Sequence, residues 1–232
     1  MNFRETAYGS ARASVLARIA AARQAASASS DVCLLAVSKT QPAAAVRALH
    51  GAGQQAFGEN YVQEALAKQA ELSDLGLEWH LIGPLQSNKC REVAERFDWL
   101  QTLDRTKLVD LLARHRPAGR PPLNVLVQVN IDDEASKSGC APRDVDTLAK
   151  AVAAQPALRL RGLMAIPAPS PDAAVRRAAF ARMRILFDAL RMEYRDVDTL
   201  SMGMSDDLDL AIAEGATMVR VGTALFGARG RG

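Results

Sequence analysis

Short apolar runs alternate with amphipathic stretches along most of the chain. The first run, residues 32–37, reads VCLLAV and has polar residues on both sides. A run of five or six apolar residues is too short for a helix and is typical of a strand buried on both faces. The pattern therefore predicts a strand that ends just before Lys39.

The same alternation recurs to the end of the chain, with a helical pattern after each strand. The expected strands begin at Val32, Gln55, Glu78, Trp99, Leu123, Leu158, Thr199 and Met218. Eight βα units in about 200 residues are the number that a closed barrel needs. We therefore predict an α/β fold consisting of a single (β/α)8 TIM barrel. A doubly wound open sheet is the alternative, and the lack of a G-x-G-x-x-G motif after the first strand weighs against it.

One further helix is expected before the barrel. Residues 4–27 are rich in alanine, and Val15, Leu16 and Ile19 recur at helical spacing. No linker rich in Gly, Ser or Pro divides the chain. We therefore expect one domain over residues 1–232, with the N-terminal helix in 1–28, the barrel in 29–227 and a tail at 228–232.

Charge and cysteine content narrow the class of protein. The net charge of +3 is mild and the charged residues are interspersed, so no basic stripe for nucleic acid is expected. Cys33, Cys90 and Cys140 are far apart and odd in number, which argues against a disulfide framework and a metal site. The sequence shows neither a signal peptide nor a run long enough to span a membrane. A cytoplasmic location is expected.

Polar residues at the ends of the expected strands are the candidate functional residues. Lys39 follows the first strand, at the end where ligands bind in α/β folds, although a lone lysine there is ordinarily a solvated charge. Loops 202–205 and 221–223 follow the last two strands and combine glycines, hydroxyls and helix starts. Such loops bind phosphate, although ordinary turn glycines and a helix cap at Ser205 explain each loop taken alone. A lysine and a separate phosphate site together are typical of pyridoxal 5′-phosphate binding.

Motifs along nearly the whole chain support this interpretation. The chain resembles the pyridoxal phosphate homeostasis proteins, a family also called YggS or PROSC-like, whose fold is similar to the N-terminal barrel of alanine racemases. The residues that carry the resemblance are Ala36–Thr40, Phe57–Glu64, His80–Lys89, Val129–Ile131 with Ser136–Gly139, Arg161–Met164, Leu200–Asp206 and Val219–Gly227.

The resemblance implies a role for several residues. Lys39 would hold the cofactor as a Schiff base, and Ser205, Gly222 and Thr223 would bind its phosphate. Arg220 would lie against the cofactor, either at the pyridine nitrogen or near the phosphate.

Two more residues would flank the cofactor. Asn60 would lie beside the ring, and Met202 would pack against the site, as would Met204. The resemblance implies no catalytic residue and no metal ligand.

A carrier is the function that the resemblance favours. The protein would hold pyridoxal 5′-phosphate and deliver it inside the cell to apoenzymes, without robust catalysis and as a monomer. An arginine at the pyridine nitrogen would weaken carbanion chemistry, because it disfavours protonation of the ring. A racemase-like enzyme that uses the cofactor is the alternative. A barrel that binds another phosphorylated metabolite, with Lys39 as a plain charge, is the third possibility.

The remaining polar residues receive structural interpretations. We favour His80 as a hydrogen-bonded residue of the barrel wall over a role as a base, and we expect Cys33 to pack inside the barrel. Glu59 and Glu64 are candidates for acid/base chemistry, although we favour roles for them as helix caps or on a helix surface. Whether Lys89 or Lys137 also binds the cofactor is left open.

Overall fold

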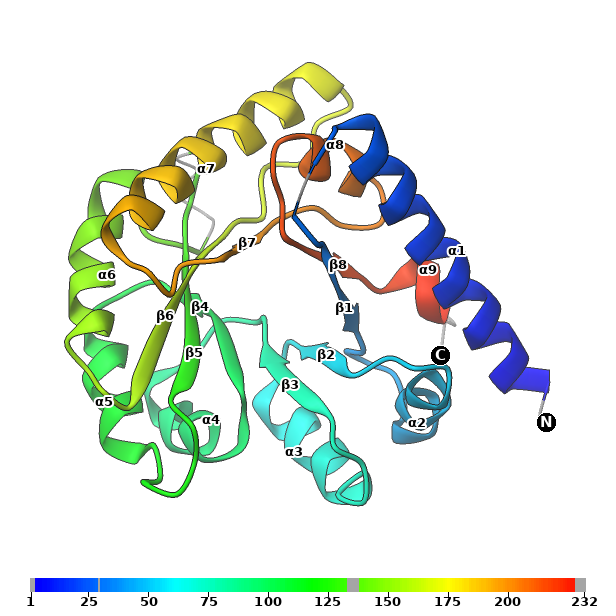
Figure 1. Ribbon diagram of the computed structural model, residues 1–232. Coiled ribbons are helices and arrows are strands. Elements are labelled where there is room, and N and C mark those ends of the chain that lie inside the picture. Colours follow the sequence, from blue (N-terminus) through cyan, green and yellow to red (C-terminus); the bar gives the residue numbers. More distant parts are fainter. Residues whose placement is uncertain (1–2, 29, 133–137, 228–232) are drawn as a thin grey trace.

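Pairing of the first and last strands closes the sheet. The computed structural model describes residues 3–28, 30–132 and 138–227. Its strands pair in chain order in one closed parallel barrel, in which β1 also pairs with β8 (Figure 1). The strands are β1 (Cys33–Val37), β2 (Ala56–Glu59), β3 (Glu78–Leu81), β4 (Trp99–Leu103), β5 (Leu123–Gln128), β6 (Leu158–Met164), β7 (Thr199–Ser201) and β8 (Met218–Val221). The predicted (β/α)8 barrel is confirmed, and the open-sheet alternative is wrong.

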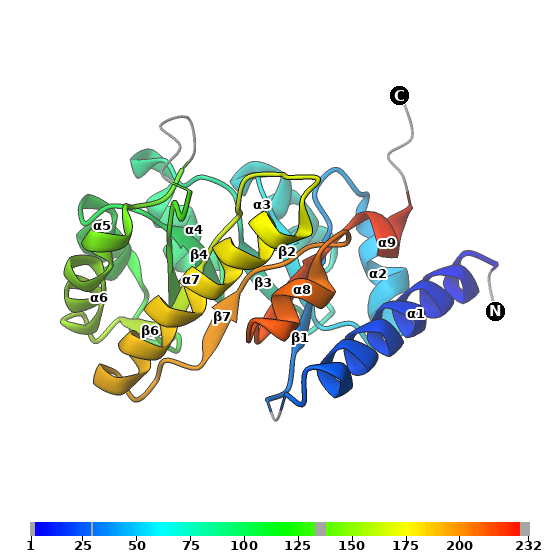
Figure 2. The same ribbon diagram turned by 90° about the horizontal axis from the view of Figure 1, so that it is seen from above.

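A helix follows every strand, and these helices surround the barrel (Figure 2). The helices are α1 (Phe3–Ala25), α2 (Ala43–Gly51), α3 (Val62–Glu71), α4 (Cys90–Arg96), α5 (Lys107–His115), α6 (Val145–Ala153), α7 (Ala173–Glu193), α8 (Leu208–Ala213) and α9 (Thr223–Phe226). Two short 3₁₀ helices, Ser87–Lys89 and Pro142–Asp144, precede α4 and α6. The tail at 228–232 and Lys137 lie outside the described residues.

The strands separate two kinds of interior. Alternate residues of a strand face opposite sides, so Leu34 and Ala36 join the large apolar layer beneath the helices, whereas Leu35 faces the barrel lumen. The apolar side chains of the lumen form two small clusters, one around Leu35 and one around Trp99. Polar side chains are buried among these strands as well, and they connect the two ends of the lumen.

Helix α1 lies outside the barrel beside α8 and α9 (Figure 1). It buries Val15 and Ile19 against the main apolar layer. Its Arg18 forms an ion pair with Asp209 of α8, and the Arg18 guanidinium also donates to the backbone oxygen of Ser205. The helix predicted before the barrel is therefore attached to the loop that follows β7.

Two simple expectations have clear outcomes. Cys33, the first residue of β1, is exposed, so the prediction that it packs inside the barrel is wrong. The physical reason is its position as the first residue of β1, at the N-terminal end of the strand, where its side chain reaches solvent. Within the described ranges, no helix is both long and apolar enough to cross a membrane.

Candidate functional site

Lys39 lies at the C-terminal end of β1, where the barrel closes. Register pairs Ala36 with Val221, so the ends of β1 and β8 lie side by side. Lys39 lines a small hollow of about 40 Å³ together with Gly222 and Thr223, which begin α9. Pockets for whole small molecules typically measure about 300 Å³ or more, so this hollow accommodates a small group such as an anion and not a whole aromatic ring. A larger ligand would extend from it over the open end of the barrel.

Gly222 is packed tightly against β1. A Cβ atom at this position would lie 3.2 Å from the backbone oxygen of Val37, which is closer than nearly all real Cβ contacts. Glycine therefore allows the start of α9 to approach the strand that leads to Lys39.

Arg220 is a buried cation in β8, two residues before Gly222. Its Nη1 atom donates to Ser201 Oγ at 2.7 Å, and its Nη2 atom donates to the backbone oxygen of Ala165 at 2.9 Å. The side chain is almost completely buried, and this burial lowers the pKa of Arg220 to about 10. Within the described ranges, no carboxylate forms an ion pair with it. A buried cation whose partners are neutral is suited to an anionic or electron-rich ligand.

A cluster of charged residues supports the backbone on both sides of Lys39. The Nζ atom of Lys68, in α3, donates to Glu59 Oε1 at 2.7 Å, to Glu64 Oε1 at 2.7 Å and to the backbone oxygen of Ser38 at 2.6 Å. The hydroxyl of Ser38 donates to Glu59 Oε1 at 2.5 Å. We call Ser38, Glu59, Glu64 and Lys68 the Lys68 cluster.

The Lys68 cluster corrects one prediction. Glu59 is the last residue of β2 and is fully buried, so the expectation of a cap or helix-surface role for it is wrong. Burial raises the pKa of Glu59, while hydrogen bonds from Lys68 and Ser38 act against this shift. The reason is that β2 delivers Glu59 beneath α3, where Lys68 is the buried residue that faces it.

Thr40 contributes a strained turn directly after Lys39. Its φ angle is +64°, a left-handed conformation that costs a residue with a Cβ atom about 1–2 kcal/mol. Its backbone N–H donates to Glu64 Oε1 of the Lys68 cluster. The cluster therefore fixes the chain both before and after Lys39, and this support offsets the strain.

The loop after β7 contains Met202, Gly203 and Ser205. Met202 is fully buried in the apolar layer beneath the helices, and Met204 is exposed. Gly203 has φ +89°, and its backbone oxygen accepts from the backbone N–H of Arg220 at 3.0 Å. This bond links the loop to β8.

Asn60 follows β2 and is pressed against the end of β3. A Cβ atom on Gly83 would lie 2.0 Å from the backbone oxygen of Asn60. The ends of β2 and β3 therefore meet closely at the mouth of the barrel.

The structure thus brings together part of the predicted site. Lys39, Gly222 and Thr223 line one hollow, and Arg220 is buried in the adjoining strand. The described contacts of Ser205 lead to Arg18, those of Asn60 to Gly83, and those of Met202 to the apolar layer. Contact of all seven residues with a cofactor stays a prediction. The described residues contain no group of three metal-binding side chains.

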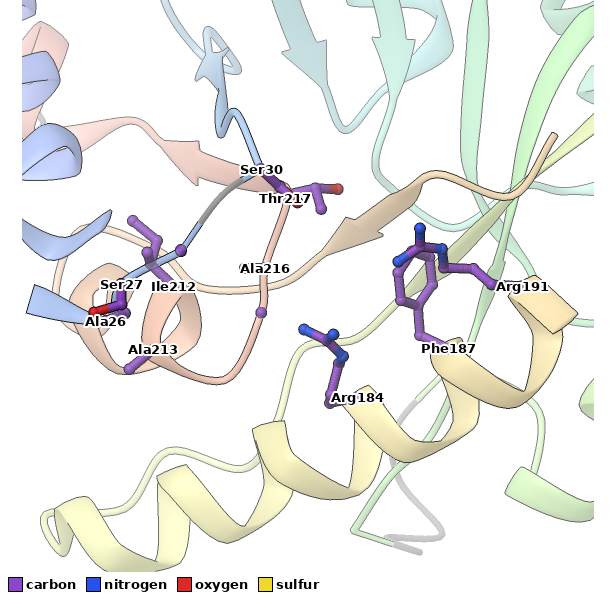
Figure 3. A pocket seen from close by; sticks show the side chains of 12 residues that line it. Ala26, Ser27, Ser30, Arg184, Phe187, Arg191, Ile212, Ala213, Ala216 and Thr217 are labelled. Atoms are coloured by element: carbon purple, nitrogen blue, oxygen red, sulfur yellow. The ribbon is translucent and has the colours of Figure 1, made fainter. Parts of the chain in front are cut away.

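A larger hollow, of about 250 Å³, lies at the opposite end of the barrel (Figure 3). It is lined by Thr217, which directly precedes β8, by the segment before β1 and by the arginines of α7. Arg184 pairs with Asp188, and the guanidinium carbon of Arg191 lies 5.5 Å from the centre of the Phe187 ring. In barrels of this type the functional residues lie at the C-terminal ends of the strands, so the Lys39 end is the stronger candidate.

Comparison with known proteins decides the family. Residues 12–230 match the family described as alanine racemase, N-terminal domain. Over 221 residues, 95% of either chain, the sequence is 62% identical to the pyridoxal phosphate homeostasis protein of Pseudomonas aeruginosa. The chain belongs to the pyridoxal phosphate homeostasis family. The resemblance predicted from its motifs is confirmed.

Solved structures of relatives agree with this family. PipY of Synechococcus elongatus, described as a structure with pyridoxal phosphate bound, is 41% identical and has a TM-score of 0.77, covering 90% of this chain and 100% of its own. The alanine racemase of Corynebacterium glutamicum is 19% identical with a TM-score of 0.67 and shows the shared fold alone. The match covers 97% of this chain and 62% of that racemase.

The residues present in this family member fit the cofactor that the family name implies. The hollow beside Lys39 has the size of a small anionic group, and the buried Arg220 has only neutral partners within the described ranges. A phosphate group and a pyridine ring would complement these two features respectively.

The motifs gave Lys39 and the glycine loops of this family, whereas the side chains that support them were missed. Lys68 lies on a helix whose other buried positions are mostly small or apolar, and a lysine there is a signal for a buried partner. Gln101 interrupts the apolar strand β4. A polar residue at the centre of a buried strand requires a hydrogen-bond partner, although the sequence does not say which.

Proposed function

We propose that the chain binds pyridoxal 5′-phosphate at the C-terminal end of the barrel and serves as an intracellular reservoir that delivers it to apoenzymes. The observation that carries the proposal is the shared hollow of Lys39, Gly222 and Thr223 at the junction of β1 and β8. It combines an amine with backbone groups at the start of a helix, and these are the two elements that the aldehyde and the phosphate of the cofactor require.

Each candidate residue then has a defined task. When bound, the cofactor supplies an aldehyde that condenses with an amine and releases water, and Lys39 provides this amine. Gly222, Thr223 and Ser205 bind the phosphate, with Gly203 allowing the loop after β7 to turn towards it.

Three residues surround the ring in this proposal. Arg220 lies against the ring, and we assign it to the pyridine nitrogen because its partners Ser201 and Ala165 lie on β7 and after β6, away from the hollow of Lys39. Asn60 borders the ring at the end of β2, and Met202 packs beneath the loop after β7 that faces the ring.

Storage without robust turnover is supported by the residues around Lys39. Within the described ranges, the residues lining the hollow are Val37, Lys39, Thr40, Gln41, Gly222, Thr223, Phe226 and Gly227. Lys39 is the one residue in this set with a side chain suited to proton transfer near neutral pH. Racemisation needs a base on each face of the substrate, and the part of the site that this hollow forms offers one base, Lys39. The turnover assay below tests the part of the site around the ring, which extends beyond the hollow.

Visible absorption tests the covalent bond. The wild-type protein mixed with pyridoxal 5′-phosphate is expected to turn yellow, and Lys39→Ala is expected to lose the band. Lys150→Ala is the matched control, because Lys150 is an exposed lysine paired with Asp146. Borohydride reduction followed by peptide mass spectrometry should place the cofactor mass on Lys39. A modified peptide that contains another lysine, with Lys39 unmodified, would contradict the assignment.

Two further measurements test storage against catalysis. The loaded protein should restore activity to an apoenzyme that needs the cofactor, and the reduced protein should fail to do so. Incubation of the loaded protein with single amino-acid enantiomers should give no turnover at enzymatic rates. Sustained racemisation or transamination that disappears in Lys39→Ala would replace the carrier proposal with an enzyme.

A further inference from the structure

A chain of hydrogen bonds runs through the lumen from Arg220 to the other end of the barrel. Arg220 Nη1 donates to Ser201 Oγ at 2.7 Å, and Ser201 Oγ donates to Gln101 Oε1 at 2.7 Å. Gln101 Nε2 lies 2.9 Å from His80 Nδ1, and His80 Nε2 lies 2.8 Å from Glu78 Oε1. We call these five residues, which come from β8, β7, β4 and β3, the lumen relay.

All four hydrogen bonds of the lumen relay point the same way. An amide nitrogen can only donate, so His80 Nδ1 must accept from Gln101, and the proton of neutral His80 is on Nε2. His80 Nε2 then donates to Glu78. The relay therefore begins at a guanidinium, passes through three neutral side chains and ends at a carboxylate.

Charge is compensated along the relay and not by direct contact. Ser201, Gln101 and His80 are fully buried, whereas the Glu78 side chain is half-exposed. The hydrogen bond from His80 holds the pKa of Glu78 below its usual value, so Glu78 remains an acceptor near neutral pH. Aligned hydrogen bonds polarise one another, and reversal of any one of them would require reversal of the others.

The ring of His80 is also fixed from its face. It stacks on Trp99 with 5.1 Å between the ring centres and 9° between the planes. The guanidinium carbon of Arg161 lies 4.7 Å from the centre of the Trp99 ring, on the same indole. His80 was predicted to be a hydrogen-bonded wall residue, and this prediction is confirmed.

We propose that Ser201, Gln101 and His80 are positioning residues that fix the orientation of the Arg220 guanidinium towards the bound cofactor. This inference rests on the proposed function. Ser201 directs its proton to Gln101 and so presents a lone pair to Arg220, while Gln101 presents its oxygen to Ser201 and its nitrogen to His80. The other Arg220 N–H groups are thereby left for a ligand bound at the C-terminal ends of β1 and β8, where the register pairs Leu35 with Arg220.

Four variants test the relay. Gln101→Leu removes both of its central bonds at similar volume, and Ser201→Ala removes the direct partner of Arg220. Ser201→Thr keeps the hydroxyl and should behave as the wild type. Gln54→Leu is the matched control, because Gln54 is a buried glutamine that donates to the backbone oxygens of Leu34 and Ala56 and has no described bond to the relay.

Three measurements separate positioning from stability. These are the thermal midpoint, the Kd for pyridoxal 5′-phosphate with the position of its visible band, and hydrogen exchange of the ¹⁵N-labelled Arg220 guanidinium without cofactor. Gln101→Leu and Ser201→Ala should weaken binding about tenfold, shift the band and speed the exchange, because each loses a hydrogen bond in a chain that begins at a charged group. Gln54→Leu should lower the midpoint alone.

The outcomes are distinguishable. If Gln101→Leu, Ser201→Ala and Gln54→Leu all keep the wild-type Kd, band and exchange rate, the positioning role is wrong. If Gln101→Leu does not fold, the pair Ser201→Ala and Ser201→Thr decides the question, because Thr keeps the hydroxyl that Ala lacks. A wild-type protein that takes up no cofactor would overturn the proposed function and this role with it, whereas cofactor uptake with unaffected relay variants would overturn this role alone.

Discussion

The Lys68 cluster and the lumen relay are both buried polar systems near the candidate site, yet they balance charge in opposite ways. In the Lys68 cluster, cation and carboxylates are in direct contact, and Lys68 Nζ lies 2.7 Å from oxygens of both Glu59 and Glu64. In the lumen relay, three neutral side chains separate Arg220 from Glu78.

This difference indicates different tasks. Charges in contact bind each other firmly, so the Lys68 cluster fixes the backbone around Lys39. A cation without a contacting carboxylate keeps much of its field available to a ligand, and the relay fixes only its direction. We therefore expect variants of the cluster to act mainly on stability, and variants of the relay to act mainly on the cofactor.

The largest expected effect comes from removing the cation of the Lys68 cluster. Lys68→Met would leave Glu59 buried beside Glu64 without its partner, and it should lower the free energy of unfolding by about 3–5 kcal/mol. Urea unfolding measures this change. Lys150→Met, at an exposed ion pair with Asp146, is the control and should leave the midpoint unchanged. Equal losses of unfolding free energy in both variants would mean that the buried Lys68 cluster stabilises the protein no more than a surface ion pair does.

A substitution between the two systems should have an intermediate effect. Gly83→Ala would place a Cβ atom 2.0 Å from the backbone oxygen of Asn60, so the ends of the strands that carry Glu59 and His80 would have to separate. We expect a loss of about 1–3 kcal/mol in thermal or urea unfolding, as for other overpacked sites. Gly76→Ala, with no atom near the added Cβ, should change little. If Gly83→Ala leaves the free energy of unfolding unchanged, these strand ends can move apart at little cost.

The Lys68 cluster should also affect how stability depends on pH. The pKa of Glu59 is raised above its usual value of 4.5, so between 4.5 and the raised value the folded state binds more protons than the unfolded state. Stability from this group is therefore present below that window and is lost as the pH rises through it. Glu59→Gln should remove this component of the slope in urea titrations from pH 4 upwards. An unchanged slope would assign it to other groups.

The smallest effect is expected at α1. Arg18→Ala removes the ion pair with Asp209 and the bond to the Ser205 backbone, both near the surface, and should cost no more than about 1 kcal/mol. If Ser205 binds phosphate, the same variant should weaken cofactor binding a few-fold, as measured by visible titration. A wild-type Kd for the cofactor in Arg18→Ala would mean that α1 does not contribute to cofactor binding.

The sequence predicted the barrel well because each strand is a short apolar run with punctuation on both sides. Lys39 and the glycine loops were accessible for the same reason, since they occupy strand ends. The lumen relay could not be predicted from the sequence, because Gln101 and Ser201 are 100 residues apart and meet only when the barrel has formed. The left-handed Thr40 carries no mark in the sequence, because its conformation depends on Glu64 in the next βα unit.

The pairing of β1 with β8 has a consequence for how the protein matures on the ribosome. The hollow of Lys39 is lined by residues of two segments, 37–41 and 222–227, that are far apart in the sequence, so the first leaves the ribosome well before the second. A nascent chain that lacks β8 has only half of this hollow, so a ligand held between the two halves favours the completed barrel over partly folded chains by mass action. Ligand binding would thus stabilise the completed barrel at the last step of folding.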